Sequence, residues 1–146
     1  AMSNYVSKAK RREIFIRAQG CCEYCHSQDY YSPQPFSIEH IIPTKRGGGN
    51  ELENLALACQ GCNNYKADKI KGLDPQSRKL VPLFHPRRQQ WDEHFAWNSD
   101  FTALIGVTPI GRATVKTLQL NRQRLVNLRR DFRAWGKHPP PIENER

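Results

Sequence analysis

The chain has 146 residues, which is enough for one domain with a modest hydrophobic core. Lysine and arginine outnumber aspartate and glutamate by 23 to 14, and the net charge of +9 favours either a polyanionic partner or simply a basic, soluble surface. No apolar stretch approaches the roughly 20 residues that cross a bilayer, and the basic N-terminal region lacks the apolar run of a signal peptide, so we expect a soluble, cytoplasmic protein.

The first half of the chain predicts a helix, a strand, a glycine-rich turn, a second strand and a second helix. Capping residues and helix formers indicate the helices, and β-branched and aromatic residues indicate the strands. We expect these elements at residues 7–19 (capped by Ser7, with an apolar stripe of Ala9, Ile14 and Ala18, and ended by Gly20), 36–42, 44–50, 55–58 and 60–72 (ended by Gly72).

The second half predicts a loop, a short helix from Pro86, two short strands joined at Asn98, and two helices. The first of these two helices begins at Thr108 and Pro109, a capping oxygen followed by a residue suited to the first helical position. Asn121 is the expected cap of the second, whose apolar core face comprises Leu125, Leu128, Phe132 and Trp135. The predicted organisation is a core at 2–74, a basic extension packed on it at 75–137, and a flexible tail at 138–146.

Five cysteines indicate a metal site rather than a disulfide framework, because their number is odd and no secretory signal accompanies them. Cys22 and Cys25 form one CxxC pair, and Cys59 and Cys62 form another. Two such pairs complete a closed tetrahedral site, so we expect a structural Zn²⁺. Cys21 is the fifth cysteine and an expected non-ligand, with a shift of one residue from Cys22 as the alternative.

Between the zinc pairs lies a second group of residues suited to metal-assisted hydrolysis. Glu39 and His40 stand together at the end of a predicted strand, where a carboxylate can bind a cation and an imidazole can take a proton from water. Asn63 lies just inside a predicted helix, and its amide oxygen could complete a site for a hard cation such as Mg²⁺ or Mn²⁺. The alternative for Asn63 is a helix cap or a partner of a zinc thiolate.

The segment from Ser37 to Lys69 resembles the HNH (ββα-metal) endonucleases, in the subgroup framed by two CxxC pairs. The resemblance rests on Glu39-His40-Ile41-Ile42-Pro43, the Gly47–Gly49 turn, Asn54-Leu55 and the CxxCNxxK pattern from Cys59 to Lys66. It implies an α+β, ββα-metal fold with a structural four-cysteine zinc site and a helical C-terminal extension. Residues 75–137 are similar to an extension of some stand-alone bacterial HNH proteins, and we expect a bacterial or phage origin.

The resemblance also implies roles for individual residues. His40 would be the general base, Glu39 and Asn63 would hold a catalytic Mg²⁺ or Mn²⁺, and Asn54 would brace the loop that positions His40. Cleavage of double-stranded DNA would leave a 5′-phosphate and a 3′-hydroxyl. The alternatives are a nuclease acting on RNA and a non-catalytic zinc module that only binds DNA.

Basic residues cluster around this motif and in the C-terminal region, where they could contact DNA phosphates. The alternative is that they only solubilise the surface. The predicted DNA contacts are Lys45, Arg46, Lys66, Arg112, Lys116, Arg122, Arg124, Arg129 and Arg130, joined by Arg133 on the last helix and by a second cluster of Lys8, Lys10, Arg11, Arg12 and Arg17.

Overall fold

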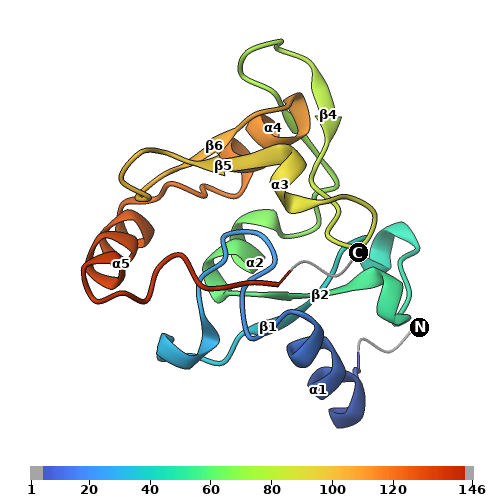
Figure 1. Cartoon of the computed structure of the whole chain (residues 1–146). Helices are drawn as coiled ribbons and strands as arrows, with labels where there is room; N and C mark the ends of the chain where they lie inside the picture. The colour runs from blue at the N-terminus through green and yellow to red at the C-terminus, as the bar shows by residue number, and fades with distance from the viewer. Residues whose placement is uncertain (1–4, 144–146) are drawn as a thin grey trace.

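The computed structural model describes residues 5–143, so residues 2–4 of the predicted core and 144–146 of the predicted tail lie outside the described residues. The elements are α1 (Lys8–Arg17), β1 (Ser37–His40), β2 (Leu55–Ala58), α2 (Gln60–Lys66), β3 (Lys71–Leu73), β4 (Leu80–Pro82), α3 (Trp91–His94), β5 (Phe95–Trp97), β6 (Leu104–Gly106), α4 (Pro109–Thr117) and α5 (Gln123–Ala134). One layer contains α1, β1, β2 and α2, and the other contains the elements from β3 to α4, with α5 at the side (Figure 1). None of the helices among the described residues is long and apolar enough to cross a bilayer.

A strand–strand–helix unit forms the centre of the first layer. β1 and β2 pair antiparallel, with His40 opposite Leu55. α2 follows β2 directly because Cys59 acts as its N-cap, and the Cys59 Sγ accepts a hydrogen bond from Cys62 N. This unit and the short antiparallel hairpins around it confirm the predicted α+β fold class.

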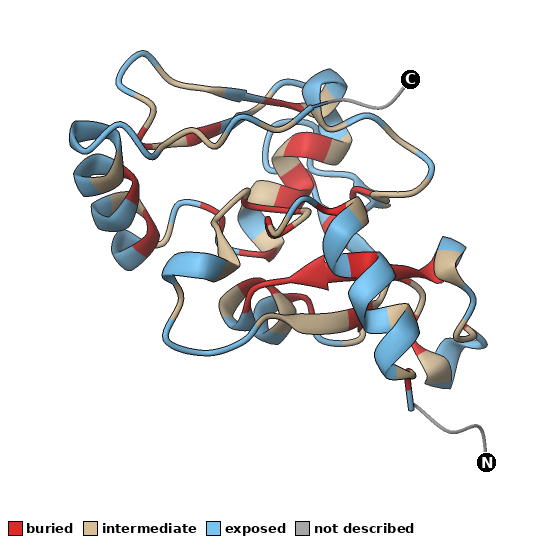
Figure 2. Ribbon diagram, turned by 60° about the horizontal axis from the view of Figure 1, so that its bottom comes forward, coloured by how far each residue is buried: buried red, intermediate tan, exposed pale blue. Residues whose placement is uncertain are grey.

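The N-terminal helix covers the buried strand of this unit. The Ser7 side chain accepts a hydrogen bond from Lys10 N, which confirms the predicted cap of α1. Ile14 is fully buried and packs with Leu55 and Leu57 of β2, which is buried along its whole length (Figure 2). Ala18, at the C-cap of α1, is buried in the same cluster, whereas Ala9 of the predicted stripe is exposed.

The second helix is shorter than the sequence predicts. α2 ends at Lys66, because the following Ala67 turns the backbone with a φ of 49°. Gly72 does not end the helix but pairs with Val81 in the β3–β4 hairpin, which straddles the predicted boundary at residue 74. A Cβ at Gly72 would lie only 2.3 Å from the Oγ1 of Thr117. The glycine therefore lets α4 pack closely on this hairpin.

The second layer confirms the predicted hairpin and one helix start. β5 pairs antiparallel with β6, and the Thr108 side chain caps α4 by accepting a hydrogen bond from Gly111 N. The short helix predicted to start at Pro86 begins instead at Trp91, as α3. Residues 86–88 form a turn, closed by hydrogen bonds from His85 N to the Gln89 side chain and from Arg87 N to the His85 ring.

The last helix departs from its predicted cap and face. Asn121 does not cap α5; its side chain binds both backbone polar groups of Leu104 in β6. Leu125 is buried as predicted, but Trp135 is 66% exposed. Arg129 takes a buried place on this helix instead, because its guanidinium donates to the backbone oxygens of Thr102 and Leu120.

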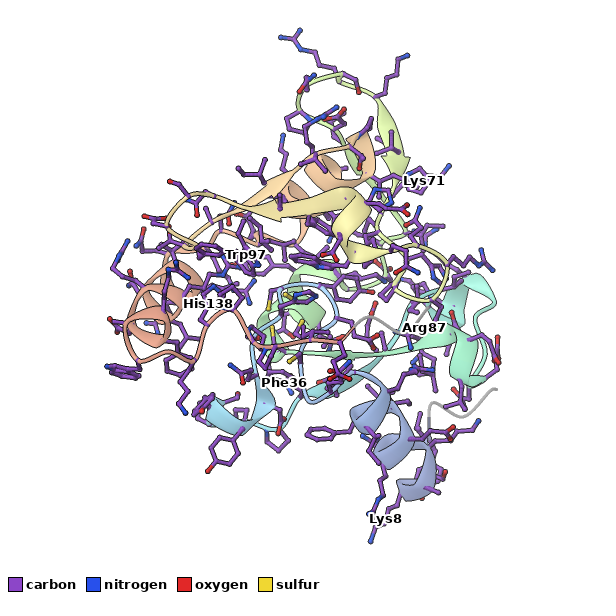
Figure 3. All side chains as sticks on the ribbon, in the orientation of Figure 1. Lys8, Phe36, Lys71, Arg87, Trp97 and His138 are labelled. Atoms are coloured by element: carbon purple, nitrogen blue, oxygen red, sulfur yellow. The ribbon has the colours of Figure 1, made fainter. Side chains whose placement is uncertain are left out.

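The described part of the tail, residues 138–143, runs along the body of the protein, in contrast to the predicted flexible tail. The His138 ring packs edge-on against Trp97 and binds the Phe101 backbone oxygen (Figure 3). Farther on, the Gln19 side-chain amide makes two hydrogen bonds to the backbone of Glu143. The tail thus connects α5 back to the end of α1.

Candidate active site and metal centre

The four cysteines of the two predicted pairs converge between the layers. Cys22 and Cys25 come from the loop after α1, whereas Cys59 and Cys62 come from the start of α2. All four are buried, and their Sγ atoms lie within 4.8 Å of one another. Figure 3 shows the sulfur atoms gathered at the centre of the molecule. This convergence confirms the cysteine cluster expected for zinc.

The geometry of the cluster fits a tetrahedral Zn²⁺ ion. Zn–S bonds of about 2.3 Å place neighbouring sulfur atoms about 3.8 Å apart, and the Sγ atoms of Cys25 and Cys59 are separated by 3.7 Å. One backbone N–H per pair also points at a sulfur, from Cys25 to Cys22 at 3.5 Å and from Cys62 to Cys59 at 3.4 Å. Such donors stabilise the negative charge of thiolates, which are the species that bind zinc.

Cys21 lies outside this cluster. Its Sγ approaches the backbone oxygen of Gln19 at 3.5 Å. Burial, with a smaller contribution from Cys25, raises the pKa of the Cys21 thiol to about 11, so it stays protonated at neutral pH. The structure therefore selects Cys22 over Cys21 as the fourth member of the site.

A surface hollow lies where β1, the loop after it and the end of α2 meet. Its walls include Glu39, His40, Lys45, Asn63 and Asp68. The structure thus brings together the base, the two metal ligands and one of the cations that the sequence predicts. Asp68 was not predicted; it forms an ion pair with Lys45, and its backbone oxygen accepts a hydrogen bond from Arg46.

The His40 ring is held by a residue that the sequence did not single out. Its Nε2 lies 2.6 Å from the Oδ1 of Asn50, whose Nδ2 donates to the Tyr5 backbone oxygen. Because the amide nitrogen is used in that second bond, the oxygen faces His40 and accepts from an Nε2–H. Within the described residues no hydrogen bond engages Nδ1, which is left as the basic nitrogen.

Glu39 is buried beside His40, and the side chains of Tyr24 and Lys66 contact its carboxylate. The Tyr24 hydroxyl donates to Oε2 at 2.5 Å, and the Lys66 ammonium lies 2.5 Å from Oε1. Burial raises the pKa of the Glu39 carboxyl, and the adjacent Lys66 opposes this rise. The Lys66 ammonium therefore compensates the charge of the buried carboxylate at Oε1.

Lys66 is the buried partner that this carboxylate requires. We expect Lys66→Met to lower the free energy of unfolding by about 3–5 kcal/mol, because it would leave a buried charge without compensation. Urea unfolding of the zinc-loaded protein measures this loss. The double variant Glu39→Gln, Lys66→Met should recover much of it, and equal losses in the single and double variants would show that the two side chains are not coupled.

The two predicted asparagines lie in different surroundings. Asn54 is buried, and its side chain accepts from Ile42 N and donates to the backbone oxygens of Ile42 and Gly49. It therefore braces the loop between His40 and Asn50. Asn63 is part of the hollow, and in the portion of the chain that the structure describes no hydrogen bond occupies its side chain.

The sequence gives only weak indications of the contacts that Lys66, Tyr24 and Asn50 make. Lys66 follows Cys62 by four residues, which places both on one face of α2, so burial of one implies burial of the other. Tyr24 stands inside the first CxxC pair, where its neighbours are fixed by the metal site. Asn50 directly follows three glycines, and only the folded loop brings it to His40.

Several of the cationic side chains predicted to contact DNA interact with other groups of the protein instead. Lys66 and Arg129 are 1% and 2% exposed, so the prediction that they contact DNA is wrong. Charged side chains are seldom buried without partners, and both have them here: Lys66 pairs with Glu39, and Arg129 donates to two backbone oxygens. Arg112 forms two hydrogen bonds to the buried Asp74, and Arg122 reaches the thiols of the zinc cluster.

Other predicted contacts remain on the surface. Within the first half, Arg17 is only partly exposed and binds the backbone oxygens of Leu52 and Leu55, and Lys10 binds that of Asn50. The exposed members of the two clusters are Lys8, Arg11, Arg12, Lys45, Arg46, Lys116, Arg124, Arg130 and Arg133.

Residues 22–69 match a family model described as HNH endonuclease. The match begins at the first zinc cysteine, contains both strands and α2, and ends just beyond Asp68. No curated protein and no solved structure gives a significant match. The family evidence therefore covers the zinc cluster and the hollow, and does not extend into residues 75–137.

Proposed function

We propose that the protein hydrolyses phosphodiester bonds of double-stranded DNA, because residues 22–69 match a family model described as HNH endonuclease. His40 acts as the general base, and Glu39 and Asn63 hold a divalent cation beside it. Asn54 keeps the connecting loop in place through its backbone hydrogen bonds. The zinc cluster has no place in the chemistry, because a closed four-cysteine site leaves no open position for substrate.

The observation that carries the proposal is the hydrogen bond between His40 Nε2 and Asn50 Oδ1. It fixes the tautomer in which Nδ1 has the free lone pair, so the ring can remove a proton from a water molecule at that nitrogen. The hydroxide formed in this way attacks the phosphorus. The leaving group is the 3′-oxygen, which takes up a proton to give a 3′-hydroxyl and leaves the phosphate on the 5′ side.

Glu39 and Asn63 suit Mg²⁺ or Mn²⁺ as the second component. Both offer oxygen atoms, which hard cations prefer, and both line the hollow beside His40. The Asn63 amide in the wall of the hollow, which no hydrogen bond occupies among the described residues, supports this assignment. When bound, such an ion neutralises the charge that develops on the phosphate and the leaving oxygen. Lys66, whose ammonium lies 2.5 Å from Glu39 Oε1, compensates the charge of this buried carboxylate.

Exposed cations near the hollow and on α5 provide the proposed DNA contacts. Lys45 and Arg46 lie on the loop that forms one wall of the hollow, and Arg124 and Arg130 are exposed on α5. Phosphate contacts by such side chains supply affinity that is independent of sequence and decreases with salt. We therefore expect DNA binding by this protein to weaken steeply as the salt concentration rises.

A cleavage assay with two substrates tests the proposed function. Zinc-loaded protein is incubated with supercoiled plasmid or with structured RNA, in Mg²⁺, in Mn²⁺ or in EDTA at a concentration that leaves the zinc bound. Metal-dependent nicking of the plasmid is the expected result. Cleavage confined to RNA would indicate a ribonuclease, and DNA binding without cleavage in either metal would indicate a non-catalytic zinc module.

Asn50 gives a prediction of its own. We expect Asn50→Ala to lower kcat on the order of 10–100-fold with little change in KM, because the imidazole loses the group that fixes its tautomer. The pH dependence of kcat should also change, which a loss of stability alone would not cause. Asn64→Ala removes an exposed asparagine from α2 and serves as the matched control. Equal kcat values for wild type and Asn50→Ala would remove Asn50 from the mechanism.

A further inference from the structure

Arg122 is the N-cap residue of α5, and its side chain contacts the zinc cluster. We propose that Arg122 is a charge-compensating clamp of the zinc site, which retards loss of the metal and fixes the C-terminal extension on the HNH domain. This role is independent of the proposed nuclease reaction, because it concerns the four-cysteine cluster alone.

The guanidinium of Arg122 lies against both sulfur atoms of the second cysteine pair. Its Nη2 is 3.4 Å from the Sγ of Cys59 and 3.8 Å from that of Cys62, and its Nη1 is 3.7 Å from the Sγ of Cys62. These contacts are within range for N–H donors to sulfur. The planar fork of arginine thus spans two ligands of one ion, which a lysine ammonium could not do in the same way.

The same side chain also binds the end of α4. Nη1 donates to the backbone oxygens of Leu118 at 3.3 Å and Gln119 at 3.2 Å, where α4 ends and its carbonyl groups lack helical partners. Arg122 therefore joins three pieces of the fold: the start of α2, the end of α4 and the start of α5. Through it the basic extension is attached directly to the zinc ligands.

Gly61 provides a second, independent observation. It lies between Cys59 and Cys62 in α2, and a Cβ at this position would lie 2.5 Å from the Nη2 and 2.8 Å from the Cζ of Arg122. Its φ is not in the left-handed region, so the helix itself does not demand glycine. The absence of a side chain at residue 61 creates the space that the guanidinium fills.

Charge explains why the site would use this arrangement. Four thiolates around one Zn²⁺ carry a net charge of −2, and here they are buried. A neighbouring cation with N–H donors reduces that charge and occupies the sulfur lone pairs that would otherwise react with protons or electrophiles. Partners in contact with metal ligands typically change metal affinity 10–100-fold when removed. Arg122 is the side-chain cation that makes such contacts among the described residues.

The experiment follows zinc release from the intact, zinc-loaded chain to a chromogenic chelator. We expect Arg122→Met to accelerate release on the order of 10-fold. Gly61→Ala should accelerate it too, although it keeps the arginine, because the added methyl group displaces the guanidinium. Arg124→Met makes the same chemical change at an exposed position of α5 and should release zinc at the wild-type rate. Release within twofold of wild type by both Arg122→Met and Gly61→Ala would overturn the proposal.

A spectroscopic measurement separates the clamp from a general loss of stability. In Co²⁺-substituted protein, the thiolate-to-metal charge-transfer band reports the electron density on sulfur. Removing N–H donors raises that density, so the band of Gly61→Ala and of Arg122→Lys should move to longer wavelength, while that of Arg124→Met should not. If Arg122→Met fails to fold, the bands of Gly61→Ala and Arg122→Lys still test the proposal. Unchanged bands in both variants would contradict the clamp.

Discussion

Replacing His40 with alanine is expected to reduce the single-turnover rate of DNA cleavage about 10²–10⁴-fold, which is the contribution typical of a general base. The reason is that no other group in the hollow can take the proton from water in the same way. Glu39 is buried and held by Lys66 and Tyr24, and Asp68 is paired with Lys45. The loss should appear in the rate at saturating enzyme, with little change in DNA affinity.

The control for this variant is His85→Ala. His85 lies outside the hollow, and its ring contacts the backbone of Arg87 in the 85–89 turn. Its loss should leave the cleavage rate within about threefold of wild type, since the ring does not line the hollow. A His40→Ala protein that retains zinc and cleaves DNA at the wild-type rate would exclude His40 as the base.

Loss of the structural zinc should have the second large effect. Cys59→Ser is expected to abolish tight zinc binding and to prevent cooperative folding, because structural zinc binding contributes on the order of 10 kcal/mol to the folding of small domains. Cys59 also caps α2 and accepts a hydrogen bond from Arg122. Its loss therefore affects the helix, the cluster and the C-terminal extension together. Zinc content by elemental analysis and near-ultraviolet circular dichroism measure the outcome.

Cys21→Ser is the matched control for the loss of zinc. Cys21 is buried next to the cluster but lies outside it, so this variant should keep one zinc per chain and unfold near the wild-type temperature. A strong chelator should likewise unfold the wild-type protein, whereas removal of Mg²⁺ should stop cleavage without unfolding it. A folded Cys59→Ser protein with an unchanged melting temperature would contradict a structural role for the cluster.

The sequence predicted the core that carries the four cysteines because its signals there are local. The CxxC spacing identifies the four cysteines that cluster, and the short segments expected to be strands contain β1 at residues 37–40 and β2 at residues 55–58. Thr108 and Ser7 cap their helices as predicted because a side-chain oxygen next to a helix start needs no tertiary context. Glu39, His40 and Asn63, which line the hollow, belong to the same local motif.

What the sequence did not reveal depends on contacts between distant segments. Gly72 was taken for a helix end, but it is required by the approach of α4 to the β3–β4 hairpin. Arg129 was assigned to a DNA-binding surface, but backbone oxygens from two other segments hold it in the interior. Asn50 reaches His40 only after the glycine turn has folded back. In each case tertiary packing overrides the preference that the residue type suggests.

The chemical ends of the cleaved strand test the central claim most directly. If His40 activates water and the 3′-oxygen leaves, plasmid nicked by the wild-type protein in Mg²⁺ should carry a 5′-phosphate next to a 3′-hydroxyl. DNA ligase should then reseal the nicks without prior end repair, and His40→Ala should produce few nicks to seal. Nicks that resist ligase until their ends are repaired, or an intact plasmid in both Mg²⁺ and Mn²⁺, would contradict hydrolysis by this site.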